Sequence, residues 1–344
     1  MISRRAFGKA VGAGAVAASL PALPGPAAAA APSSPATGSG AAPGLGPVRT
    51  ARTDLLDIAY HEVGPARGEV VLLGHGWPYS PHSYAEVVPA LARRGYRVLV
   101  PYLRGHGATR FRAADTPRSG QQAALGADVI AFLDALGVER AVFGGYDWGG
   151  RALDVAAALW PHRCRALVSV NGYLIQNLDP DVLAGSPDAP GTESAHWYFY
   201  FFLTDRGRTA LTRSRRELAE VVWRRNSPLW RFTRADLDVA AAAMDNPDYV
   251  DVVVHNYRVR QDAAPGDPRY AGLEARLLAQ PPITVPAVTL DGLADGSFPA
   301  TDGTASARHF TGPRVHHRVP GAGHNLPQEK PRAFVDAVLE AVRL

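Results

Sequence analysis

The sequence predicts an α/β protein with a mostly parallel, doubly wound sheet and a helical domain inserted between two parts of that sheet. Strand and helix candidates alternate through residues 50–172, which is typical of a parallel sheet flanked by helices. From 173 to 282 helical, aromatic and arginine-rich sequence replaces the strand pattern, and the alternation returns over 283–344. We therefore expect a two-part core, 50–172 and 283–344, and a helical lid at 173–282.

The individual elements follow from apolar runs bounded by glycine and proline. Strands are predicted at 69–74, 96–100, 141–144, 166–170, 283–290 and 315–319, and helices at 84–94, 121–136, 151–160 and 331–344.

The N-terminal 31 residues are predicted to be a twin-arginine export signal. Arg4 and Arg5 precede the small, apolar stretch 11–23, and the alanine-rich run 27–31 offers an A-x-A cleavage site. Residues 32–49, rich in Ala, Gly, Pro and Ser, are predicted to be a flexible leader. We expect the mature protein in the periplasm, the cell wall or the medium.

Composition excludes several classes of partner. Arg4, Arg5 and Lys9 carry three of the four formal positive charges, so the mature chain lacks the charge typical of nucleic-acid binding. Cys164 is the single cysteine, which rules out an intrachain disulfide. The mature chain has no apolar run of the ~18 residues that a membrane span needs. With no metal-ligand spacing or phosphate loop, we expect a small-molecule substrate, no cofactor and no metal.

Residues 145–150, Gly-Tyr-Asp-Trp-Gly-Gly, match the frame of a nucleophile elbow with aspartate in place of serine. A strand candidate precedes this hexapeptide and a helix candidate follows it, as the motif requires. Asp147 is already an anion at neutral pH and can attack carbon directly. The alternative is an acidic N-cap, because aspartate is favoured at helix starts.

Two further residues complete a triad in the order nucleophile, acid, histidine. Asp295 lies in the loop after the strand 283–290 and is the predicted acid, with Asp291 as its competitor. His324 lies in a glycine-rich loop after the strand 315–319 and is the predicted base. His316 and His317 fall inside that strand and are expected to be structural.

The turn His75-Gly76-Trp77-Pro78 follows another strand candidate. In this architecture one oxyanion donor is a backbone N–H in that loop, and the other is the N–H after the nucleophile. These rules assign the backbone N–H groups of Trp77 and Trp148. An ordinary turn is the alternative, because Gly and Pro mark turns generally.

Together these motifs resemble the α/β-hydrolase superfamily, within it the branch of epoxide hydrolases and haloalkane dehalogenases. The turns 75–78 and 323–324 and the elbow 145–150 carry the resemblance, which extends over roughly residues 50–344. Residues 104–107 resemble the family's Arg-Gly-x-Gly turn, although Tyr102 replaces the aspartate usual there. The resemblance implies the α/β-hydrolase fold and an aspartyl-ester mechanism.

The resemblance also implies two lid tyrosines that hold and protonate an epoxide oxygen. Tyr198 and Tyr257 match those positions, in the segments 197–202 and 255–258. Tyr200 is the fallback, and His75, Trp197 and Tyr200 are expected to contact substrate. The alternative is that these aromatic residues pack only as a helix face. On this basis the chain is predicted to convert an epoxide to a vicinal diol.

Two other functions stay open. A haloalkane or haloacetate dehalogenase would use the same Asp147 and His324. Haloacetate dehalogenases resemble the chain at Arg151, but they place arginine after the nucleophile and histidine first in the lid. This chain has Trp148 and Tyr198 there, although His196 could take the histidine position after a shift in register. A non-catalytic binding protein on a hydrolase scaffold is the second alternative.

Overall fold

The computed structural model describes residues 44–185 and 189–344, so the predicted export signal and most of the leader lie outside the described residues. Nine strands form one sheet in the order β1-β2-β4-β3-β6-β7-β8-β9, with β5 paired to β2, in this part of the chain. The strands are β1 (Val48–Arg52), β2 (Leu56–Val63), β3 (Val70–Gly74), β4 (Arg97–Pro101), β5 (Arg110–Phe111), β6 (Ala141–Gly145), β7 (Cys164–Val170), β8 (Ala287–Gly292) and β9 (Arg314–Val319).

From β4 to β9 the sheet is parallel, as predicted, whereas β1, β2 and β5 pair antiparallel. β3, β6 and β8 are buried along their whole length, which explains why β3 and β6 appear in the sequence as continuous runs of apolar residues and glycine. The predicted strand 283–290 begins later than expected, because Pro286 lacks an N–H and the ladder of β8 begins only at Ala287.

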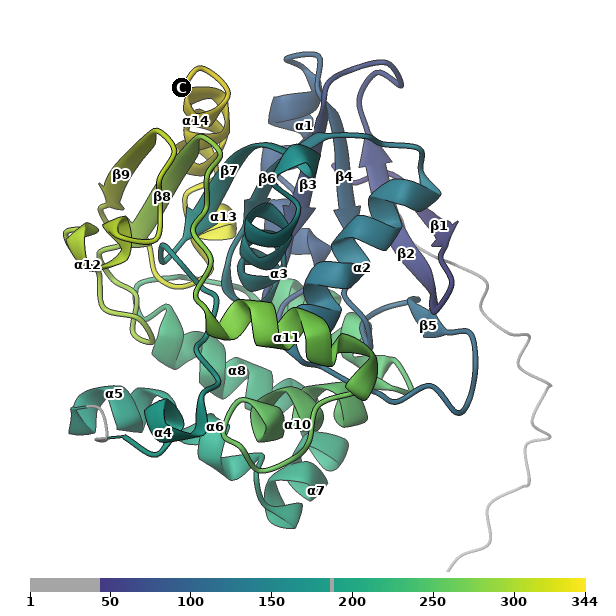
Figure 1. The fold of residues 1–344 in the computed structure, drawn as a ribbon, viewed down its shortest axis with the longest axis vertical. Coiled ribbons are helices and arrows are strands. Elements are labelled where there is room, and N and C mark those ends of the chain that lie inside the picture. Colours follow the sequence, from purple (N-terminus) through teal and green to yellow (C-terminus); the bar gives the residue numbers. More distant parts are fainter. Residues whose placement is uncertain (1–43, 186–188) are drawn as a thin grey trace, which may run out of the picture. The chain divides into compact units, whose positions relative to one another are not determined.

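Helices cover both faces of the sheet (Figure 1). α2 and α3 pack against each other, and α1 packs against α14 on the opposite face, as right-handed crossovers require. The core helices are α1 (Val87–Ala92), α2 (Gln122–Ala135), α3 (Asp147–Leu159), α12 (Thr304–Ala307), α13 (Leu326–Glu329) and α14 (Pro331–Ala341).

Between β7 and β8 the described chain forms helices and no strand. These inserted helices are α4 (Pro180–Leu183), α5 (Pro190–Ala195), α6 (Trp197–Phe201), α7 (Asp205–Arg213), α8 (Arg215–Asn226), α9 (Arg234–Ala242), α10 (Tyr249–Val259) and α11 (Ala271–Leu278). α11 packs against α2 of the core, and α10 contacts α6 and α7.

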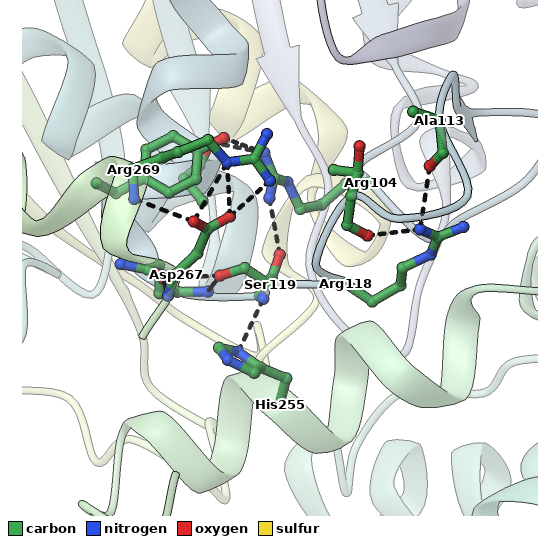
Figure 2. Close-up of polar contacts among 12 residues, drawn as sticks. Arg104, Ala113, Arg118, Ser119, His255, Asp267 and Arg269 are labelled. Carbon is green, nitrogen blue, oxygen red and sulfur yellow. Dashed lines mark hydrogen bonds and ion pairs between the residues drawn. The ribbon is translucent and has the colours of Figure 1, made fainter. Parts of the chain in front are cut away.

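A core loop before α2 holds the inserted helix α10 in place (Figure 2). The Gly120 N–H donates to Nδ1 of His255 at 3.1 Å, and the side-chain amide of Asn256 donates to the Gly120 carbonyl. Arg104, only 2 % exposed, pairs with Asp128 at 2.7 Å and donates to the Ser119 carbonyl. The same contacts therefore fix the position of Tyr257, which α10 carries.

Glycines bring the start of α3 against the end of β3. A Cβ on Gly149 would lie 2.1 Å from the carbonyl carbon of Gly74, and a Cβ on Gly74 would lie 2.9 Å from Gly149. Backbone cannot yield as a flexible side chain can, so only glycine permits this contact. The close approach sets the elbow against the turn that carries Trp77.

Gly149→Ala should therefore destabilise the protein by roughly 2–3 kcal/mol, the upper range for overpacking. Gly272→Ala is the matched control: this glycine also lies in a helix, α11, and nothing stands within 4 Å of the position of its added Cβ. We expect the control to stabilise the fold by up to ~1 kcal/mol. Urea titrations of both variants measure the two changes, and equal effects would contradict the close-packing argument.

Candidate active site

The predicted nucleophile Asp147 is the first residue of α3 and follows directly on β6 and Tyr146. Its φ is +50°, a left-handed conformation that is uncommon for residues other than glycine. Such strain is found mainly where the surrounding structure imposes it, functional sites above all. The turn Tyr146–Trp148 thus has the geometry that the elbow motif predicts.

The predicted oxyanion donors both reach the Asp147 carboxylate. The Trp77 N–H donates to Oδ1 at 2.6 Å, and the Trp148 N–H is close enough to lower the pKa of the same carboxyl group. The two N–H groups come from the ends of β3 and β6, which are paired in register at Gly74 and Gly145. Because neighbouring parallel strands end at the same edge of the sheet, their following loops converge here.

His324 lies between two carboxylates. Its Nδ1 is 2.9 Å from Oδ2 of Asp295, and its Nε2 is 3.4 Å from Oδ2 of Asp147. Asp295, the preferred acid, is therefore the one that contacts the histidine. Asp291 instead accepts hydrogen bonds from the N–H and hydroxyl of Thr301.

The charges of this triad shift one another's titration. Burial alone would lower the pKa of His324, but the carboxylates of Asp295 and Asp147 raise it to about 10. Burial would raise the pKa of Asp147, but the hydrogen bond and charge of His324 and the N–H groups of Trp77 and Trp148 lower it. At neutral pH the site thus holds a carboxylate at Asp147 beside a protonated His324.

Three residues that the sequence analysis did not select hold the triad in place. Asn171 donates through Nδ2 to Oδ2 of Asp295 at 3.2 Å. Ser227 accepts from the His324 N–H at 3.0 Å and donates to Glu329 at 2.7 Å. Asn171 directly follows β7, so the rule that site residues follow strand ends could have found it. No local pattern marks Ser227 or Glu329.

The two predicted lid tyrosines meet over the elbow. Tyr198 comes from α6 and Tyr257 from α10, and their ring centroids lie 5.6 Å apart. Both rings pack on Trp77, at 5.4 and 5.3 Å, and Tyr257 also contacts Trp148 at 5.8 Å. Both tyrosines are buried, and the negative charge of Asp147 contributes to the raised pKa of each.

The three residues predicted to contact substrate, His75, Trp197 and Tyr200, differ from one another in burial and in their contacts. Both ring nitrogens of the fully buried His75 are used by backbone groups, the Gly76 carbonyl and the Leu103 N–H. The histidine thus joins two loops, which corrects its predicted role. Tyr200 is 45 % exposed and donates to Glu193. Trp197 packs on Tyr198 at 5.9 Å, beside the tyrosine pair.

The competing histidines lie apart from the nucleophile. His196, which a dehalogenase would place in the site, stacks on Phe199 at 4.6 Å and packs at a tilt against Phe298 at 4.9 Å. His316 pairs with the Thr289 hydroxyl and His317 with Glu340. The inward position next to Trp77 is thus occupied by Tyr198.

Over residues 44–185 and 189–344, no three His, Cys, Asp or Glu side chains are grouped so that they could hold a metal ion. Within the same ranges, every helix is too short or too polar to cross a membrane.

Comparisons with known proteins agree with this geometry. Residues 69–331 match the α/β hydrolase fold family. A solved structure of a candidate epoxide hydrolase from Klebsiella pneumoniae is 45 % identical, covers 86 % of this chain and 97 % of its own, and superposes with a TM-score of 0.83. Epoxide hydrolase A of Mycobacterium tuberculosis is 26 % identical over 81 % of this chain and 92 % of its own length.

Bifunctional epoxide hydrolase 2 of Sus scrofa is 37 % identical over 33 % of this chain. The match spans only 20 % of that protein, and 22 % of its counterpart from Mus musculus.

The chain therefore belongs to the α/β-hydrolase fold family. Within that family it is epoxide hydrolase-like, as its relatives and the similar Klebsiella pneumoniae structure indicate.

Proposed function

We propose that this protein is an epoxide hydrolase that opens an epoxide to a vicinal diol through an ester on Asp147. The observation that supports this most directly is the pair of buried tyrosines, Tyr198 and Tyr257, packed on Trp77 beside the nucleophile. An epoxide oxygen needs a proton as its ring opens, and a phenol can donate one. Burial keeps both phenols protonated at neutral pH, because it raises their pKa.

In the first step a carboxylate oxygen of Asp147 attacks one ring carbon. The C–O bond of the ring breaks, and the oxygen takes a proton from a tyrosine. The products are an alkyl ester on Asp147, a β-hydroxyl group and a tyrosinate. Asp147 is suited to this attack because the pKa of its carboxyl group is lowered, so it is ionised over the physiological range.

The second step depends on a change in charge. The ester has no negative charge at Asp147, so the pKa of His324 falls and His324 returns its proton to the tyrosinate. Neutral His324, oriented by Asp295, then takes a proton from water, which attacks the ester carbonyl. The Trp77 and Trp148 N–H groups hold the oxyanion. Release of the diol restores the carboxylate and the protonated His324.

We also propose that the inserted helices act as a lid over this site and that the chain is exported by the twin-arginine pathway. The lid proposal rests on α6 and α10, which place the tyrosines. The export proposal rests on the N-terminal sequence alone. N-terminal mass spectrometry of protein recovered outside the cytoplasm tests it, and an uncleaved cytoplasmic chain would contradict it.

A panel of epoxides and halogenated acids, with diol and halide release followed together, tests the proposed reaction. We expect diol formation, with 18-O from solvent in the product after multiple turnovers. Fast halide release without diol across the panel would make the protein a dehalogenase that uses the same Asp147.

Tyr198→Phe and Tyr257→Phe should each slow the alkylation step by about 10- to 100-fold, less than the roughly 10²–10⁴-fold that general acid catalysis contributes, because one phenol remains in each variant. The double variant should lose nearly all epoxide turnover, because each phenol can partly replace the other. Tyr200→Phe is the control, since its exposed hydroxyl contacts Glu193, and it should stay within about threefold of wild type. Single-turnover rates of ester formation provide the measurement. Unchanged rates in the double variant would remove the tyrosines from the mechanism.

The proposed drop in the His324 pKa can be observed directly. The Asp147→Asn variant has a neutral amide at position 147, and it therefore mimics the uncharged ester. The pKa of His324 in this variant should fall below its value of about 10 in the wild type. Nitrogen NMR of labelled histidine across pH 5 to 10 reports this pKa. The pKa of His324 is about 6.5 in the unfolded chain and about 10 in the folded wild type, so protonation of His324 stabilises the fold. This stabilisation is complete below pH 6.5 and is lost as the pH rises through 10. An unchanged histidine pKa in the variant would contradict the switch.

A further inference from the structure

Two arginines are buried near the tyrosine pair without a carboxylate partner. Arg151 is 7 % exposed and Arg260 is 8 % exposed. Neither forms an ion pair with any carboxylate of residues 44–185 and 189–344, whereas Arg104, which is also buried, pairs with Asp128. Nη1 of Arg151 is fully buried and has no hydrogen-bond partner among the described residues.

Two short tethers hold the guanidinium groups near each other. Nε of Arg151 donates to the Leu174 carbonyl at 2.9 Å, and Nε of Arg260 donates to the side-chain oxygen of Gln176 at 2.7 Å. Leu174 and Gln176 are two residues apart, so their Cα atoms are separated by at most about 7 Å. In agreement, the positive charge of Arg260 contributes to the lowered pKa of Arg151.

Both arginines also face the reaction centre. Arg151 lies one helical turn after Asp147 on α3, on the same face of the helix. The Arg260 guanidinium lies 4.6 Å from the ring centroid of Phe199 and 5.7 Å from that of Tyr257. Asp147 and Tyr257 act electrostatically on both arginines.

The hydrogen bonds of Arg151 and Arg260 do not explain why a charged side chain is buried at each of these positions. A carbonyl and an amide oxygen are neutral acceptors, and a neutral side chain could satisfy them without the cost of burying an ion. Isolated buried charges are costly, so they are normally paired. Asp154, three residues after Arg151 on α3, acts electrostatically on Arg151 but forms no ion pair with it. Its carboxylate accepts from the Leu174 N–H, and burial raises its pKa to about 7.

The charge balance of the site points the same way. With His324 protonated, Asp147, Asp295 and His324 carry one net negative charge, against two positive charges on the arginines. Asp154, whose pKa burial raises to about 7, adds only part of a further negative charge at neutral pH. Esterification of Asp147 removes a further negative charge during the reaction. One carboxylate on the substrate would neutralise the net positive charge of the site before the reaction. It would also reduce the larger positive charge that remains when Asp147 is esterified.

We propose that Arg151 and Arg260 form a subsite for the carboxylate of the substrate, and that the substrate is therefore a short epoxy acid. This rests on the proposed function of the same site and adds its substrate class. A carboxylate accepts two parallel hydrogen bonds from a guanidinium, and the unpaired Nη1 of Arg151 is available as a donor. Because Arg151 is one turn from Asp147, about 6 Å along the helix, only a few bonds separate the carboxylate from the reacting carbon.

Glycidate and glycidamide provide the matched substrates, since they share one three-carbon epoxide and differ in carboxylate against uncharged amide. For the wild type, kcat/KM for glycidate should exceed that for glycidamide by at least about tenfold. Arg151→Gln and Arg260→Gln should each lower kcat/KM for glycidate by about 10- to 100-fold, the usual range for hydrogen bonds to a charged group. Glycidamide turnover should change by less than about threefold.

Arg208→Gln is the control, because Arg208 also lies in the inserted helices but pairs at the surface with Asp251. It should leave both substrates unaffected. If a glutamine variant fails to fold, Arg151→Lys and Arg260→Lys keep the charge, and the wild-type preference between the two substrates remains a decisive measurement.

A binding experiment separates this inference from the proposed reaction. Glycerate, the diol of glycidate, should bind the wild type in isothermal titration calorimetry, whereas glycerol should not, and either glutamine variant should weaken glycerate at least about tenfold. Diol formation from glycidate and glycidamide with equal efficiency, unaffected by the arginines, would overturn the subsite and leave the epoxide hydrolase standing. Arginine-dependent glycerate binding without diol from any epoxide would overturn the reaction and keep the subsite.

Discussion

Replacing Asp147 with alanine should reduce epoxide turnover by at least about 10⁴-fold, comparable to removal of a nucleophile in other hydrolases. The reason is that, within residues 44–185 and 189–344, this carboxylate alone contacts both the Trp77 N–H and His324, and we propose that it forms the ester. Steady-state diol formation measures the effect, and circular dichroism shows that the fold is kept. Substantial turnover by this variant would remove the nucleophile assignment.

Asp147→Asn should be equally inactive, and it keeps a residue type that tolerates the left-handed conformation at φ +50°. This variant therefore separates the effect of losing the carboxylate from the effect of disturbing the left-handed backbone conformation. Mass spectrometry must exclude deamidation back to aspartate. Asp134→Ala, an exposed aspartate that pairs with Arg163 at the surface, should behave as wild type.

His324→Gln should stop the reaction after its first half. The variant can still form the ester, but nothing takes a proton from water, so the alkyl-enzyme accumulates. Intact-protein mass spectrometry should show an increase equal to the substrate mass, located on the peptide that carries Asp147. Multiple turnover should fall by several orders of magnitude while one equivalent of epoxide is still consumed.

His316→Gln serves as the matched control for this experiment. His316 lies in β9 and contacts Thr289, so its loss should leave turnover within about twofold of wild type. An adduct at a residue other than Asp147, or no adduct with a substrate that the wild type consumes, would contradict the two-step scheme.

The site residues that could be predicted are those that lie in short sequence motifs directly after strands. Gly145 to Gly150 predict a tight turn from local sequence, because glycine adopts the conformations that such a turn needs. The structure adds that only glycine permits the contact of Gly149 with Gly74. In a parallel sheet, all carboxyl ends lie at one edge, so residues after β3, β6, β8 and β9 were expected to converge. The assignments of Asp147, Asp295 and His324 to one site follow from this rule alone.

The positions of the two lid tyrosines were predicted from the resemblance to epoxide hydrolases, and no periodicity in the sequence predicts them. Tyr198 and Tyr200 are two residues apart in one aromatic segment, and the sequence does not show which faces inward. Packing of α6 against α10 decides it, since Tyr198 reaches Trp77 and Tyr257 whereas Tyr200 reaches Glu193 at the surface.

By itself, the sequence predicted the parallel part of the sheet, the elbow and the order of the candidate triad residues, because these depend on local periodicity, on glycine and on strand ends. The antiparallel strands β1, β2 and β5 were not predicted. Only the tertiary structure decided which charges are neutralised. The sequence shows no charge partner for Arg104 or Arg151, yet Arg104 pairs with Asp128, whereas Arg151 donates to the neutral Leu174 carbonyl. The physical reason is that ion pairing acts over about 4 Å between residues far apart in the chain, and packing alone sets those distances.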